Sequence, residues 1–434
     1  MDSSQHQPSR DPAKVEKFIP RSGRYRLIQA AHWTMEKFSP ACRLDAEEIE
    51  RQALKIAGRE SFLGNTHRAR LHCLVESLQV EAGLNALGRV STAQSIIGIL
   101  VNRLCLEEIC GVANPSDADL LRPAKPPVFI VGLPRTGTTL LQKLMTSDPA
   151  ARSLPLWEGA FPFMVANRRS DRKTIPARQA EIARLVQASH IVAPRLAAIH
   201  ELDPLGAEEC YWLLMNTLAD YIFLVRWRVP AFHELLDAMG EDEWVGVYRE
   251  YLATLRILDG GITDRHWVLK YPFHARRMAT IARLLPNAIF VQTYRDITEV
   301  VGSFSSLLTE SRGICSDLSD PAGDAKDCLQ LFSKFSREAE DVVGLLADRV
   351  VHVHYKALTA DPLGVLRGIY DRAGLDWTPE GEESMRGALA KNRKDRHGRH
   401  EYSLEDFGLE EHQVRLACAP YEARERSLAH KLTE

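Results

Sequence analysis

Residues 132–139, Gly-Leu-Pro-Arg-Thr-Gly-Thr-Thr, place glycines, threonines and one arginine at a spacing suited to binding an anion. The apolar run 128–131 before them predicts a strand, and residues 138–145 predict the start of a helix. At such a junction the backbone N–H groups point into the turn, and the helix dipole adds positive potential. The spacing G-x-x-x-x-G-x-T is that of a phosphate-binding P-loop, but Thr138 replaces the usual lysine and the basic residue is Arg135. The pattern therefore predicts a phosphate site unlike that of an ordinary ATP or GTP hydrolase.

A second candidate anion site lies further along the chain. Residues 287–296 predict a buried strand that ends in the pair Arg295-Asp296, and residues 297–307 predict a helix with Asp296 or Thr298 near its N-cap. A guanidinium can bind a phosphate with two hydrogen bonds, and the hydroxyl of Ser303, two turns into the helix, can share the same oxygens. Taken alone, this segment favours a surface Arg295 paired with Asp296 and an incidental helical Ser303; after the first loop, the phosphate-binding interpretation is favoured.

The segment PRTGTTLLQ, residues 134–142, resembles the 5′-phosphosulfate loop of sulfotransferases that use PAPS (3′-phosphoadenosine-5′-phosphosulfate). The resemblance implies that Arg135 reaches the oxygen bridging phosphate and sulfate. It also implies that the loop backbone and the hydroxyls of the threonines hold the 5′-phosphate, and that Arg295 and Ser303 bind the 3′-phosphate. The residues assigned to the 5′ side are Arg135, Thr136, Gly137, Thr138 and Thr139.

The resemblance extends beyond the two phosphate loops. The helical lead-in 44–106, the Trp-Glu pair at 157–158 and the segments 267–272 and 402–409 are similar to a large, mostly bacterial branch of soluble sulfotransferases. The resemblance therefore spans roughly nine-tenths of the chain, and the two phosphate loops are its most specific parts. They imply transfer of the sulfuryl group of PAPS to a hydroxyl of a small-molecule or lipid acceptor, with release of PAP (adenosine 3′,5′-bisphosphate).

In-line transfer needs a base for the acceptor proton and positive charge at the leaving phosphate. The resemblance assigns the charge to Arg135 and to Lys270, which ends a predicted core strand. For the base, Glu158 ranks first because its position resembles that of the catalytic carboxylate of tyrosylprotein sulfotransferases. His200 ranks second, since it matches a recurrent histidine of this branch. His274 ranks third: it follows Lys270 as the catalytic histidine does in the cytosolic enzymes, but the spacing differs.

The expected fold class is α/β, a P-loop-like parallel sheet flanked by helices with an N-terminal helical extension. Strands are predicted at 128–131, 267–269, 289–294 and 350–354, and residues 312–326 are predicted to form a mobile loop. The predicted organisation is a disordered tail at 1–16, a helical region at 17–122 and a catalytic domain at 123–434, with an acceptor-binding helical insert around 150–262.

Aromatic side chains gather in the insert, which favours an apolar or aromatic hydroxyl compound or a lipid over a polysaccharide. They are Trp157, Phe161, Phe163, Tyr211, Trp212, Tyr221, Phe223 and Trp227. The basic tract 391–400 lies where the family often has a loop over the 3′-phosphate and adenosine, so Arg393 and Arg399 are candidate cofactor contacts.

Bulk properties exclude several other classes of protein. A net charge of −3 over 434 residues gives no support for nucleic-acid binding. The N-terminal segment lacks the apolar core of a signal peptide, and no run reaches the length of a transmembrane helix, so a cytoplasmic enzyme is expected. No residue cluster has metal-ligand spacing, and the family needs no metal. The N-terminal helices are compatible either with packing on the catalytic core or with a homodimer.

The sequence is also compatible with two alternative functions. A small-molecule kinase could use the loop 132–139 for ATP, although Thr138 and the lack of an evident strand-end Asp for Mg²⁺ argue against it. A non-catalytic nucleotide-binding protein could also keep the fold. The presence of Arg135, Lys270, Arg295 and Ser303 together argues against loss of activity.

Overall fold

The computed structural model describes residues 31, 33–34, 43–163, 174–192, 202–261, 264–318, 320–391 and 403–432. Its centre is one five-stranded parallel sheet with the strand order β2-β3-β1-β4-β5. The strands are β1 (Val128–Gly132), β2 (Ala151–Arg152), β3 (His266–Lys270), β4 (Ile289–Tyr294) and β5 (Val350–His354). The α/β fold class and the four predicted strands are confirmed. The edge strand β2 was not predicted because two residues are too short for any periodic signal.

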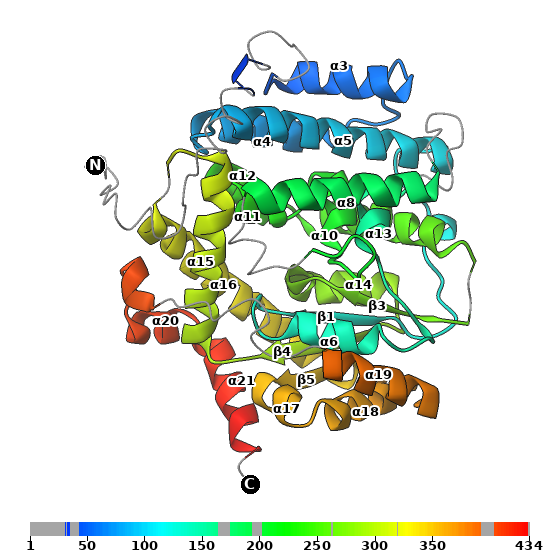
Figure 1. Cartoon of the computed structure of the whole chain (residues 1–434), viewed down its shortest axis with the longest axis vertical. Coiled ribbons are helices and arrows are strands. Elements are labelled where there is room, and N and C mark those ends of the chain that lie inside the picture. Colours follow the sequence, from blue (N-terminus) through cyan, green and yellow to red (C-terminus); the bar gives the residue numbers. More distant parts are fainter. Residues whose placement is uncertain are drawn as a thin grey trace.

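The strands are almost continuously apolar because helices cover both faces of the sheet. Val128 and Ile130 of β1 pack in one core with α6, α17, α18 and α19, whereas Phe129 and Val131 face a larger core on the other side. Figure 1 shows α17 to α19 gathered beyond one face of the sheet. The helices of this layer are α6 (Thr138–Met145), α17 (Tyr355–Ala360), α18 (Pro362–Ala373) and α19 (Pro379–Lys391).

The opposite face carries most of the helices. Those between β2 and β3 are α7 (Leu156–Ala160), α8 (Ile175–Val192), α10 (Tyr211–Leu214), α11 (Ile222–Arg226), α12 (Pro230–Ala238) and α13 (Glu241–Asp259). Those that follow are α14 (Met278–Leu284), α15 (Ile297–Cys315), α16 (Pro321–Leu345), α20 (Glu411–Ala417) and α21 (Ala419–His430). Short 3₁₀ turns are Asp117–Asp119, Met215–Thr217, Pro272–Arg277, Ala347–Arg349 and Leu404–Phe407.

The N-terminal helices α3 (Ala46–Ala57), α4 (Arg68–Val80) and α5 (Ala86–Cys110) stack at the end of the molecule remote from α17 to α19 (Figure 1). The start and end of α3 follow from its caps: the Asp45 carboxylate accepts from the N–H of Glu48, and Gly58 ends the helix in a left-handed conformation. Side chains of these helices belong to the same core as Phe129 and the α13 to α16 layer. The described residues include no helix long and apolar enough to span a membrane.

The expectation of a mobile loop at residues 312–326 was wrong. Residues up to Cys315 continue α15, and α16 begins at Pro321. The Asp, Pro and Gly residues that suggested a loop instead begin a helix, because proline fits the first helical position. The buried Arg312 joins the two helices through ion pairs to Asp324 (2.6 Å) and Asp327 (2.7 Å).

Candidate active site

The loop between β1 and α6, called the P-loop below, turns at two glycines that no other residue could replace without a clash. Gly132 has φ 122°, and a Cβ there would lie 2.7 Å from the carbonyl oxygen of Thr293. Gly137 has φ 96°, and a Cβ there would lie 2.8 Å from the ring of Tyr355. Arg135 between them is also in the left-handed region, at φ 69°. Turns of this kind, next to a helix N-terminus, direct backbone N–H groups into an anion-binding concavity.

The two candidate phosphate-binding segments meet at this loop. Arg135 donates from Nε to the hydroxyl of Ser303 (3.0 Å), and Arg295 donates from Nη1 to the carbonyl oxygen of Arg135 (3.3 Å). Asp296 caps α15 by accepting from the N–H groups of Thr298 and Glu299, which places Ser303 on the helix face toward the loop. Residues far apart in the sequence are thus brought into one basic cluster by the adjacency of β1 and β4.

Arg295 is held on three sides. Its guanidinium carbon lies 4.7 Å from the centre of the Tyr355 ring, its side chain is paired with Glu299, and its backbone N–H donates to the hydroxyl of Tyr421. Its side chain is still 26% exposed. The pre-oriented guanidinium can therefore meet an incoming anion, although Glu299 competes for it.

A third cation lies behind the P-loop. Lys270 ends β3 with a side chain only 2% exposed; its ammonium group pairs with the carboxylate of Glu209 and approaches the hydroxyl of Thr139 (3.4 Å). The N–H of Cys210 donates to the carbonyl oxygen of Lys270 (2.9 Å), which fixes the start of α10 against the strand end. Glu209 was not predicted as a site residue, because its pairing with Lys270 depends on this long-range contact.

A cavity of ≈ 580 Å³ opens in front of these groups, and we call it the P-loop cavity. Its polar lining is Arg135, Thr138, Thr139, Ser189, His190, Glu209, Arg226, Arg295, Ser311 and Thr359. The rest is Pro134, Gly137, Leu140, Leu202, Tyr211, Trp212, Ile222, Val225, Tyr271, Pro272, Phe273, Phe304, Leu307, Ile314 and Tyr355. The lining therefore combines cations, among them Arg135 and Arg295, with many aromatic and aliphatic side chains, a combination suited to a charged ligand beside an apolar one.

His274 does not suit the role of base. Its ring is fully buried, in contact with the rings of Phe129, Tyr251 and Tyr271, and its Nδ1 is hydrogen-bonded to the hydroxyl of Tyr248 at 2.9 Å. Burial lowers the pKa of His274 to about 3. A ring enclosed in this way cannot meet an acceptor in the P-loop cavity, so we do not retain it as the base.

Glu158 also lies apart from the described lining of the P-loop cavity. It sits in the first turn of α7, where its carboxylate pairs with Arg152, and the guanidinium of Arg152 lies 4.7 Å from the centre of the Trp267 ring. His200, Arg393 and Arg399 lie outside the described residues. Among the carboxylates considered, Glu209 is the one that lines the cavity.

Comparisons with known proteins agree with this geometry. The model of the sulfotransferase family matches residues 126–379. The sulfotransferase STF1 from Mycobacterium tuberculosis H37Rv has a crystal structure that superposes with a TM-score of 0.72 at 26% identity, over 86% of this chain and 98% of that one. The sulfotransferase STF9 from Mycobacterium avium has the same fold, with a TM-score of 0.75 at 22% identity over 86% of this chain and 95% of that one. A search of curated proteins finds no match. Because the family model covers more than half of the sequence, the chain belongs to the sulfotransferase family.

Proposed function

We propose that the protein transfers the sulfuryl group of PAPS to a hydroxyl group of a small-molecule or lipid acceptor and releases PAP. The observation that carries this proposal is the contact of Arg135 with Ser303 and Arg295, since both arginines line the P-loop cavity. A nucleotide with phosphates on both its 5′ and 3′ carbons needs two anion sites, and the candidates for them are the N-terminus of α6 with Arg135, and Arg295 with Ser303. Gly132 and Gly137 let the turn pack closely against Thr293 and Tyr355, which fixes the loop conformation next to the N-terminus of α6.

In the proposed reaction PAPS supplies the sulfuryl group: its sulfur–oxygen bond to the 5′-phosphate breaks while a bond to the acceptor oxygen forms. Arg135 and the N-terminus of α6 stabilise the negative charge that passes to the bridging oxygen. The ammonium group of Lys270 lies near the same region, because it donates to the hydroxyl of Thr139 at the start of α6. Arg295 and Ser303 orient the nucleotide through its 3′-phosphate, and the apolar end of the cavity excludes water from the reacting atoms.

We assign the role of general base, which takes the hydroxyl proton of the acceptor, to Glu209 rather than to Glu158. Glu209 lines the P-loop cavity and is paired with Lys270, so the base and a leaving-group cation would sit side by side. When Lys270 turns toward the phosphate, its salt bridge to Glu209 weakens, and the freed carboxylate can accept the proton. Glu158 remains the alternative, because its pairing with Arg152 would have to open first.

Thermal-shift titrations test the donor. A ligand that binds only the folded state raises its stability, by about 2.7 kcal/mol at a hundred times the dissociation constant. PAP is expected to raise Tm strongly, and AMP much less, since AMP has no 3′-phosphate. No response to PAP, together with stabilisation by ATP and Mg²⁺, would replace this proposal with the kinase alternative.

The variants Glu209→Gln and Glu158→Gln test the base. Loss of a general base lowers turnover about 10²- to 10⁴-fold, so Glu209→Gln should lose turnover to this extent while still binding PAP. Removing the negative charge beside Lys270 should leave PAP affinity equal or higher, which separates loss of the base from loss of the site. Glu158→Gln is the matched control and should keep most of its turnover. The reverse result would move the base to Glu158, and full activity in both variants would point to His190, which also lines the cavity.

A further inference from the structure

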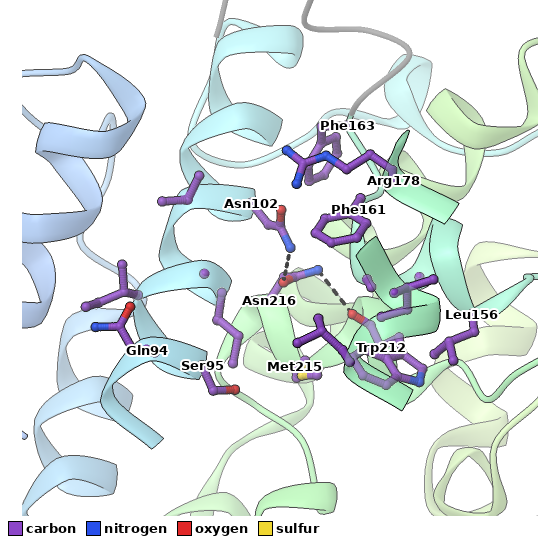
Figure 2. A pocket seen from close by; sticks show the side chains of 18 of the residues that line it. Gln94, Ser95, Asn102, Leu156, Phe161, Phe163, Arg178, Trp212, Met215 and Asn216 are labelled. Carbon is purple, nitrogen blue, oxygen red and sulfur yellow. Dashed lines mark hydrogen bonds between the residues drawn. The ribbon is translucent and has the colours of Figure 1, made fainter. Parts of the chain in front are cut away.

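A second cavity lies next to the P-loop cavity, between the N-terminal helices and the insert. It has a volume of ≈ 650 Å³ and is bounded by α3, α5, α7, α8 and α10. Figure 2 shows Phe161, Phe163, Leu156 and Met215 arranged around it. Aliphatic side chains form the largest group among its other lining residues, and we call it the apolar cavity. Ile56 of α3, which is 60% exposed, has its side chain on this wall rather than in the core.

The apolar cavity also has polar lining residues (Gln94, Ser95, Asn102, Arg178, Ser189 and Asn216), and several of them have partners within the protein. Asn102 donates from Nδ2 to Oδ1 of Asn216 (3.1 Å), and Asn216 donates from Nδ2 to the carbonyl oxygen of Trp212 (3.3 Å), as the dashed lines in Figure 2 show. Arg178 lies over the ring of Phe161 at 4.4 Å and is paired with Glu181 (2.6 Å). A sugar would need hydrogen-bond partners in place of those it has in water, whereas an aliphatic chain needs none. The walls therefore favour an aliphatic occupant.

The two cavities share walls. Ser189 and Leu202 line both, and so does Trp212, which stands between them. A ligand can thus place a polar head at the P-loop and extend beyond Trp212. Ligand cavities usually measure about 300 to 1,000 Å³, so the apolar cavity has room for a substantial hydrophobic group in addition to what the P-loop cavity holds.

We propose that the acceptor is a long-chain lipid alcohol, with its hydroxyl group in the P-loop cavity and its aliphatic chain in the apolar cavity. The inference rests on the proposed function for the identity of the reacting group. The binding of the chain by the apolar cavity is independent of it. The N-terminal helices then contribute directly to acceptor selection, since α3 and α5 form one wall of the chain-binding site.

Gly98 of α5 provides a precise probe of this cavity. It lines the apolar cavity, and a Cβ built on it meets no atom within 4 Å. Gly98→Phe should therefore fill the cavity without disturbing the backbone. Gly368 of α18 is the matched control, because it is also a helical, exposed glycine with no atom within 4 Å of a built Cβ, and it lines neither cavity.

The experiment is a fluorescence titration with dansyl-labelled undecanol, followed by displacement with 1-dodecanol. The native protein should bind the probe, Gly98→Phe should bind it at least about tenfold more weakly, equivalent to 1.4 kcal/mol, and Gly368→Phe should match the native protein. Ile56→Asp, which places a charge on the exposed wall, should also weaken binding of the probe. This second variant keeps the test decisive if Gly98→Phe does not fold. Probe affinity within twofold of native in both cavity variants would overturn the proposal.

The native protein, Gly98→Phe and Gly368→Phe are then titrated with PAP by thermal shift. Equal stabilisation by PAP in all three, with probe binding lost only in Gly98→Phe, supports both the donor site and the chain site. Absence of any PAP response would contradict the proposed function but leave the probe result to stand on its own. Sulfuryl transfer to 1-dodecanol should show a raised KM in Gly98→Phe, with transfer to 4-nitrophenol unchanged; an equal change for both acceptors would argue against a chain site.

Discussion

The variant Arg295→Ala should weaken PAP binding about 10- to 100-fold, because in the proposed complex it removes a charge-assisted hydrogen bond to the 3′-phosphate worth about 1.5–3 kcal/mol. AMP has no 3′-phosphate and should lose much less affinity. The guanidinium is already oriented by Tyr355 and by the carbonyl oxygen of Arg135, so little ordering accompanies binding in the native protein. Calorimetric titration of the two nucleotides with native and variant protein measures the selectivity directly.

Glu299→Gln is the matched control for Arg295→Ala. It keeps the arginine but removes the carboxylate that pairs with it. PAP affinity should stay the same or rise, since the phosphate no longer competes with a carboxylate for the guanidinium. Equal losses of PAP and AMP affinity in Arg295→Ala would instead mean that the arginine only holds the P-loop in shape.

A second large effect is expected at Arg135. Arg135→Ala should lower kcat about 10²- to 10³-fold, the range seen when one preorganised donor to a developing negative charge is lost. The nucleotide keeps its contacts with the loop backbone, Arg295 and the helix N-terminus, so PAP affinity should fall far less than kcat. Single-turnover measurements with PAPS and a hydroxylated acceptor separate the chemical step from binding.

Ser303→Ala provides the comparison for Arg135→Ala. The Ser303 hydroxyl accepts from Nε of Arg135, so its loss should leave the charge present but less well oriented. Turnover should then lie between that of the native enzyme and that of Arg135→Ala. If Arg135→Ala raised KM without changing kcat, the arginine would contribute to ground-state binding alone, and the leaving-group assignment would have to pass to Lys270.

The sheet and the glycine turn between β1 and α6 could be predicted from the sequence because their signals are local. Four short apolar runs bounded by turn residues were enough for β1, β3, β4 and β5, and the glycine spacing was enough for the loop. The helix start at Asp296 was also predicted, since a side-chain cap depends only on its next few residues. The prediction of a loop at residues 312–326 was wrong because the residue types that form loops are also those that begin helices.

The tertiary pairings could not be predicted in the same way. Glu209 comes to the site only because the start of α10 is hydrogen-bonded to the end of β3, and no spacing rule carries that information. His274 follows Lys270 closely in sequence, but the 3₁₀ turn after β3 directs it into the core, where it meets Tyr248. The apolar cavity depends on three separate helical regions and has no motif at all.

The backbone of Arg135 is strained, because this non-glycine residue has a positive φ. A non-glycine residue in the left-handed region is less stable there by about 1–2 kcal/mol than in a right-handed conformation, whereas glycine adopts it freely. Because Arg135 has a φ of 69°, the substitution Arg135→Gly would relieve this strain in the loop without making any other part of the backbone more rigid. At this position folding alone would favour glycine, and the arginine marks a place where conformational strain is tolerated while a positive charge is held beside the phosphate-binding turn that we propose.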